Sequence, residues 1–214
     1  ALKVVDGVIS KRYVTFVNPG RSLGAHITQL TGITDKMLAD APPIEELIED
    51  VVRFCGDLPL LGHNIRFDYS FLKHAAVNRG LEFERHGIDT LTLCRAFMTG
   101  DTRKNLSCAC AYFHVPQSTA HRAQADAEAA HLLYQELMSR HSQDQPDMFA
   151  PRPLIYKAKR DQAATKRQKE YLQDLLKCHR IDVTVQIEDM SRSQASRMID
   201  TIISQYGRIP RQIF

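Results

Sequence analysis

The sequence predicts an α/β protein whose mixed sheet is flanked by helices and followed by a small C-terminal helical hairpin. Strand-like runs alternate with amphipathic helical patterns along residues 1–139, as in layered α/β domains. Asp6-Gly7 separates two strand-like runs and is typical of a tight antiparallel turn, so we expect the sheet to be mixed. Two further amphipathic patterns near the C-terminal end predict the hairpin.

The expected elements follow from periodicity and from the residues that begin or end them. In chain order they are strands over 2–5 and 8–17, a helix over 42–55, a strand over 58–61, a helix over 65–78, a strand over 88–93, and helices over 106–113 and 122–139. Pro42-Pro43 favours a helix start. Asn64 is a suitable N-cap for the helix that Arg79-Gly80 ends.

A linker is expected over residues 140–160, between a domain over 1–139 and a small helical domain over 161–214. Thr165 and Ser191 each precede a glutamine by three residues, which is the spacing of a capping box. An apolar helical stripe follows each cap, so we expect the two helices to pack against each other.

Composition favours an intracellular protein, and its charge distribution fits either a polyanionic partner or a solvated helix surface. Residues 1–150 carry 15 Lys+Arg and 18 Asp+Glu, a net charge of −3, whereas residues 151–214 carry 13 and 7, a net charge of +6. The five cysteines have no zinc-site spacing and are expected to be reduced thiols. No apolar run approaches the roughly 20 residues that span a bilayer, so we expect a cytoplasmic protein without a membrane partner.

Two aspartates stand on helical stripes that otherwise carry apolar residues. Asp68 shares a face with Phe71, and Asp126 shares one with Leu133, so both carboxylates are expected near a core, as are the rings of Phe67 and Phe71. An unpaired buried carboxylate typically costs about 3–5 kcal/mol. We therefore expect a cation to meet both acids, and a divalent metal ion is the candidate.

His121 stands five residues before Asp126, just ahead of the predicted helix. A histidine there can take a proton from a metal-bound water near neutral pH, although a surface or capping role is the alternative. Asp89 stands at a predicted strand end and is either a supporting group of the site or a turn residue.

The chain resembles the DEDDh 3′–5′ exonucleases, in particular the epsilon proofreading-subunit type of bacterial DNA polymerase III. Leu61-Gly62-His63-Asn64-Ile65-Arg66-Phe67-Asp68 is similar to the second exonuclease motif of that family, and His121-Arg122-Ala123-Gln124-Ala125-Asp126-Ala127 is similar to the third, histidine-type motif. The resemblance extends over residues 1 to about 139.

The resemblance implies an RNase H-like fold and hydrolysis of phosphodiester bonds at 3′ ends of single-stranded DNA with two Mg²⁺ or Mn²⁺ ions; RNA is not excluded as the substrate. It assigns Asp68 and Asp126 as metal ligands and His121 as the general base. His26, Thr28 and Asn64 are candidates for binding the terminal nucleotide, with capping as the alternative for Asn64.

One motif of the family is missing from this sequence. The first motif is Asp-x-Glu on a strand ahead of the hairpin, and no Asp-x-Glu precedes the hairpin here. We therefore expect an N-terminally truncated fold without its first strand, or a degenerate version, and weak or no nuclease activity. The alternative function is a non-catalytic adaptor that binds a sliding clamp or nucleic acid.

The predicted linker contains a possible docking peptide. Gln145, Met148 and Phe149 fit the short Gln-x-(Ser/Asp)-(Leu/Met)-Phe pattern with which bacterial proteins bind the replication sliding clamp. The alternative is that these apolar side chains pack against the domain.

Overall fold

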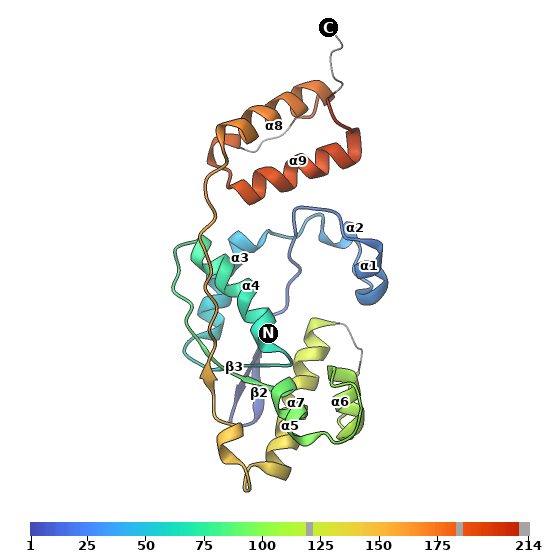
Figure 1. Cartoon of the computed structure of the whole chain (residues 1–214), viewed down its shortest axis with the longest axis vertical. Helices are drawn as coiled ribbons and strands as arrows, with labels where there is room; N and C mark the ends of the chain where they lie inside the picture. Colours follow the sequence, from blue (N-terminus) through green and yellow to red (C-terminus); the bar gives the residue numbers. More distant parts are fainter. Residues whose placement is uncertain (119–121, 183–185, 210–214) are drawn as a thin grey trace.

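The computed structural model describes residues 1–118, 122–182 and 186–209 (Figure 1). The strands are β1 (Leu2–Val5), β2 (Val8–Arg12), β3 (Leu60–Gly62), β4 (His86–Asp89) and β5 (Arg152–Pro153). The helices are α1 (Ala25–Thr31), α2 (Asp35–Leu38), α3 (Ile44–Cys55), α4 (Ile65–Asn78), α5 (Thr90–Phe97), α6 (Leu106–Tyr112), α7 (Ala123–His141), α8 (Lys166–His179) and α9 (Arg192–Tyr206). Two 3-10 turns, η1 (Pro146–Met148) and η2 (Ile187–Asp189), complete the described elements.

The central sheet is mixed, as the sequence predicts. Strands β3 and β4 run parallel with Gly62 opposite Asp89, and β5 pairs antiparallel with the start of β4, where His86 lies opposite Pro153. Strands β1 and β2 form a separate two-stranded hairpin. The second strand ends at Arg12 instead of Val17, because Arg12 already pairs with Leu2, the first residue of β1.

Helices cover the sheet through two apolar clusters. The first cluster joins α3 and α4 to the segment ahead of β4, with Ile48, Tyr69 and Phe83 fully buried. The second joins α5, α6 and α7, with Leu133 and Leu137 fully buried. Both helices that carry the candidate aspartates, α4 and α7, therefore pack beside β3.

The predicted strand over 88–93 is wrong beyond Asp89. The Asp89 side chain accepts a hydrogen bond from the backbone N–H of Leu91 (3.0 Å), which makes it the N-cap of α5. Leu93 and Cys94 lie on the buried side of this helix and belong to the second cluster. A short apolar run fits a strand or a helix equally well, and here the cap decides for the helix.

The segment expected to be a linker contributes to the first unit as far as Leu154. Phe149 is buried in the second cluster, and Leu154 is buried in the first. Leu154 packs directly on β4, since a Cβ atom on Gly87 would lie 2.7 Å from its side chain. Backbone pairing through β5 and these two anchors therefore hold the chain against the sheet.

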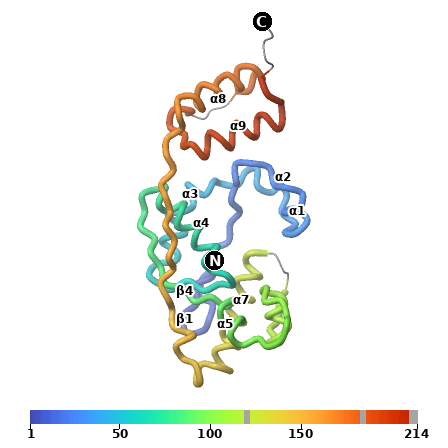
Figure 2. Tube along the Cα trace, in the orientation of Figure 1, coloured from blue at the N-terminus to red at the C-terminus, as the bar shows by residue number. Residues whose placement is uncertain are grey.

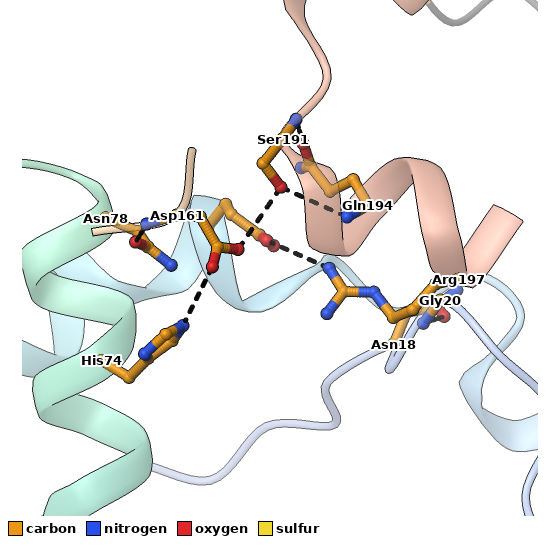
Figure 3. Close-up of polar contacts among 9 residues, drawn as sticks. Asn18, Gly20, His74, Asn78, Asp161, Ser191, Gln194 and Arg197 are labelled. Carbon is orange, nitrogen blue, oxygen red and sulfur yellow. Dashed lines mark hydrogen bonds and ion pairs between the residues drawn. The ribbon is translucent and has the colours of Figure 1, made fainter. Parts of the chain in front are cut away.

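The C-terminal helices form the expected hairpin around a third apolar cluster, and both predicted capping boxes are present at Thr165 and Ser191. The chain reaches this hairpin along an extended path that passes α4 (Figure 2). A polar junction joins the two units (Figure 3). Asp161 donates its backbone N–H to Asn78 Oδ1 (2.8 Å), and its carboxylate lies 3.7 Å from His74 Nε2 and accepts from Ser191 Oγ (3.4 Å).

Among the helices that the structure describes, none combines the length and the apolar character needed to cross a membrane.

Candidate active site

The candidate site begins at the carboxyl ends of β3 and β4. These strands are parallel, so the turn after Gly62 and the Asp89 side chain meet at one edge of the sheet. Asp89 Oδ1 accepts the backbone N–H of Asn64 (2.8 Å) in addition to that of Leu91. Asp89, at the end of β4, thus holds the residue that precedes α4. It has a structural role, which the sequence alone did not decide.

Asn64 precedes α4, as the sequence predicts, but its side chain makes no capping hydrogen bond. Its backbone is left-handed (φ 67°), a conformation that asparagine tolerates better than most residues. Its exposed side chain is therefore free to contact a ligand at the sheet edge.

His63 fastens a loop to this edge, a role that the sequence motif alone did not reveal. Its Nε2 atom lies 2.7 Å from the carbonyl oxygen of Lys104, and its Nδ1 atom lies 3.0 Å from Thr90 Oγ1. A carbonyl oxygen only accepts, so Nε2 carries the hydrogen. Burial lowers the pKa of His63, and the hydrogen bond to Lys104 opposes that shift.

Asp68 lies in the first turn of α4, close to Asp89. The residue is exposed at the surface, although surrounding protein atoms partly desolvate its carboxyl group. This desolvation raises the pKa of Asp68, and the negative charge of Asp89 adds to the rise. Two carboxylates so placed attract a cation.

The aromatic neighbours of Asp68 are on the surface, which corrects the expectation of a core position. Phe67 is 61% exposed and Phe71 is 64% exposed, and their ring centroids lie 5.0 Å apart. The apolar cluster instead uses the opposite side of α4, including Tyr69 and Ala76. Asp68 is therefore exposed on the same stretch of α4 as this pair of aromatic rings.

Asp126 is half-buried in the first turn of α7. Its Oδ1 atom accepts a hydrogen bond from Gln117 Nε2 (3.3 Å). Burial raises the pKa of Cys110, and the charge of Asp126 raises it further, which places the carboxylate close to α6. His121 lies outside the described residues, and its role as base stays a prediction.

Helix α1 carries the exposed His26 and the half-buried Thr28. The side chain of Arg122, the residue before α7, reaches Gly32, the residue after α1, since a Cβ atom on Gly32 would lie 3.2 Å from Arg122 Nη2. This side chain links the end of α1 to the start of α7.

The donors at this edge are carboxylate oxygens, which Mg²⁺ and Mn²⁺ prefer. Within residues 1–118, 122–182 and 186–209, no three His, Cys, Asp or Glu side chains gather into one metal-binding group. Asp68 and Asp126 fit a divalent ion by their chemistry, and a complete two-ion site needs further carboxylates.

The proposed clamp-binding peptide is not a free segment. Phe149 is buried between α5 and α7, Met148 packs against the same cluster, and the turn at Gln145 continues from the end of α7. A docking partner would have to remove Phe149 from the core, so the structure gives the sliding-clamp interaction no support.

The observed architecture is an RNase H-like fold. The solved structure of Exonuclease X in complex with 5′ overhanging duplex DNA is similar, with a TM-score of 0.53 and 24% identity over 69% of this chain and 85% of that chain. This likeness concerns the fold.

The chain belongs to the RNase_T exonuclease family, whose model matches residues 1–134. The family predicted from the sequence is therefore confirmed. The PolC-type DNA polymerase III of Bacillus subtilis (strain 168) is 40% identical over 141 residues, which are 64% of this chain and 10% of the relative. The 3′-5′ exonuclease DinG of the same organism is 29% identical over 141 residues, or 65% of this chain and 15% of the relative. The chain thus spans a small part of the length of these relatives.

Proposed function

We propose that this chain carries the core of a 3′–5′ exonuclease that removes nucleotides from the 3′ end of single-stranded DNA. The observation that carries the proposal is the position of Asp68, which lies close to Asp89 at the carboxyl edge of the sheet and in the same helix turn as two exposed aromatic rings. Ligands of open α/β sheets bind at this edge. Exposed aromatic rings are suited to stacking on the bases of a single strand.

Each candidate residue has a distinct role in this proposal. Asp68 and Asp126 would hold divalent ions from α4 and α7. When bound, such ions stabilise charge on the attacking and leaving oxygens of the phosphodiester. His121 would accept the proton of the attacking water as the general base.

The terminal nucleotide would lie between α1 and the sheet edge. Asn64 supports this placement because its side chain is exposed at the edge and makes no capping bond. His26 and Thr28 would contact the nucleotide from α1, whose following residue, Gly32, is reached by the side chain of Arg122. DNA is favoured over RNA because the relatives include PolC-type DNA polymerases III.

The experiment compares residues 1–214 with the same chain preceded by a strand that carries Asp-x-Glu. Both proteins receive Mn²⁺ and a 5′-labelled single-stranded oligonucleotide. We expect the extended protein to shorten the oligonucleotide from its 3′ end and residues 1–214 alone to do so weakly or not at all. An extended protein that binds the oligonucleotide but leaves it intact would contradict the proposal and favour a non-catalytic nucleic-acid-binding adaptor.

A further inference from the structure

Residues 155–160 form an extended strip between two fixed points. The strip begins beside Leu154, which is buried and whose N–H donates to the carbonyl oxygen of Arg85 (2.9 Å). It ends at Asp161, whose N–H donates to Asn78 Oδ1 (2.8 Å). The strip therefore lies alongside residues 78–85 and connects β5 to α8 (Figure 1).

The strip is held in place without burying its charged side chains. Lys157, Lys159 and Arg160 are exposed, and only Ala158 is half-buried. In the part of the chain that the structure describes, no acidic side chain forms an ion pair with these three cations. By contrast, Lys169 on α8 is bound to Glu188 (2.7 Å). The strip thus presents three positive charges within four residues, none of them in an ion pair with another described residue.

A pocket of about 330 Å³ lies under the first half of the strip. Its lining brings Arg85 and His86 of the sheet together with Tyr156 and Lys157 of the strip. Glu84 also lines the pocket, but its carboxylate is bound by Lys73, which lowers the pKa of Glu84. Among the described residues neither Arg85 nor Lys157 forms an ion pair, so both charges remain for an anion, although Arg85 Nη1 already donates to the carbonyl oxygen of Glu84 (2.8 Å) and its guanidinium lies over the ring of Phe83.

Apolar groups are exposed beside these cations. Tyr156 is 42% exposed and Ile155 is 73% exposed, although both follow the buried Leu154 directly. An aromatic ring beside a row of cations is the combination that single-strand-binding proteins use, because every base offers a face for stacking. One exposed ring followed by three cations distinguishes the strip from an ordinary solvated helix surface.

We propose that Arg85, Tyr156, Lys157, Lys159 and Arg160 form a second contact site for the phosphodiester backbone of single-stranded DNA, distinct from the candidate active site. This basic strip would hold a part of the strand remote from its 3′ end. The site lies at the start of β4, whereas the candidate active site lies where β4 ends. This proposal depends on the proposed function in one respect, since that function identifies the bound polymer as single-stranded DNA.

The test measures binding to an oligonucleotide of about 20 thymidines, a length that exceeds a single binding site. Binding of the full chain is followed by fluorescence anisotropy in EDTA, so that no hydrolysis is needed. The triple variant K157Q/K159Q/R160Q should bind about tenfold more weakly at low salt. The slope of log K against log salt should become shallower by about 2, since three phosphate contacts are lost.

The matched control is K166Q/R167Q/K177Q, which removes the same charge from exposed positions of α8. The control should keep its affinity within about twofold and its salt slope unchanged. Tyr156→Ala should weaken binding about tenfold with an unchanged salt slope, and Tyr156→Phe should restore it, because stacking needs only the ring. Circular dichroism checks that every variant is folded.

Equal losses in the two triple variants would show a general charge effect and overturn the proposal, as would wild-type binding by K157Q/K159Q/R160Q. Failure of the nuclease assay leaves this result intact, because the binding assay uses no metal ion and no turnover. The two proposals therefore fail independently.

Discussion

Asp68 shows how a functional side chain can oppose stability. Its pKa is raised, so the folded protein binds a proton there more readily than the unfolded chain does. The stability that this proton confers is present below the ordinary carboxyl pKa of 3.8 and is lost as pH rises through the raised value. At neutral pH, without metal, the ionised carboxylate is therefore unfavourable beside Asp89.

Replacing Asp68 by Asn should accordingly raise the melting temperature of the metal-free protein near neutral pH, since the partly desolvated charge is removed. The gain should shrink as pH falls through the raised pKa of Asp68, because the native carboxyl group then binds its own proton. Thermal unfolding across pH measures this. Asp126→Asn is the control, because Asp126 accepts a hydrogen bond from Gln117; a larger gain from that control would contradict the account.

His63 should make stability depend on pH in the opposite direction. Burial lowers its pKa below 6.5, so the unfolded chain takes up a proton before the folded protein does. The stabilisation is complete above pH 6.5 and is lost as pH falls through the lowered value. His63→Gln should flatten this part of the stability profile, whereas His26→Gln, on an exposed position of α1, should not. Identical profiles for both variants would refute the role of His63.

The predicted base can be separated from the predicted metal ligands. In the protein extended by the Asp-x-Glu strand, His121→Ala should lower turnover by about 10²–10⁴-fold, the usual size of general-base catalysis. Mn²⁺ affinity should change less than in Asp68→Ala. Equal loss of metal binding in the two variants would mean that His121 is a ligand.

At the scale of the elements, local patterns predicted most boundaries. The helix α4 and both capping boxes follow from periodicity and from hydrogen bonds between residues close in the sequence. The strand expected over 88–93 was wrong because Asp89 caps α5 through Leu91, and a short apolar run does not tell a strand from a helix. The packing of Phe149, one of two alternatives for its segment, depends on partners in α5 and α7, and such contacts leave no periodic signal in the sequence.

Phe149 should therefore behave as a core residue. Phe149→Ala should destabilise the first unit by about 3–5 kcal/mol, the usual cost of removing a buried phenylalanine. Phe71→Ala is the matched control: its ring is 64% exposed, and its loss should change stability by less than about 0.5 kcal/mol. Urea unfolding measures both. A near-neutral Phe149→Ala would restore the interpretation of a free docking peptide.

The molecule as a whole consists of two apolar units joined by polar contacts. The junction rests on Asp161 with His74, Asn78 and Ser191, and each of these contacts can be replaced by water (Figure 3). The segment before it, by contrast, is fixed by β5 and by buried Leu154.

Shortening the chain should reveal this difference. A chain ending at residue 160 should keep the melting temperature of the first unit, because only polar contacts are lost. A chain ending at residue 141 should melt at a lower temperature, because it lacks Phe149, Leu154 and β5. Calorimetry distinguishes the two. Equal melting temperatures would show that the segment after α7 contributes nothing.

The candidate site was predictable only in part. Helical stripes and motif resemblance singled out Asp68 and Asp126, and the structure places each of them in the first turn of its helix. The exposure of Phe67 and Phe71 was not predictable, because an amphipathic pattern does not tell which of two flanking faces meets the sheet. The loop contact of His63 spans 41 positions and has no sequence signal.

The most direct test of the account is whether Asp68 and Asp126 act on the same metal ions. Electron paramagnetic resonance measures Mn²⁺ binding to the protein extended by the Asp-x-Glu strand, for Asp68→Asn, Asp126→Asn and the double variant. We expect each single change to weaken binding and the double change to cost less than their sum, with a coupling of about 0.5–3 kcal/mol. Strictly additive losses, or unchanged binding in either single variant, would contradict a shared site.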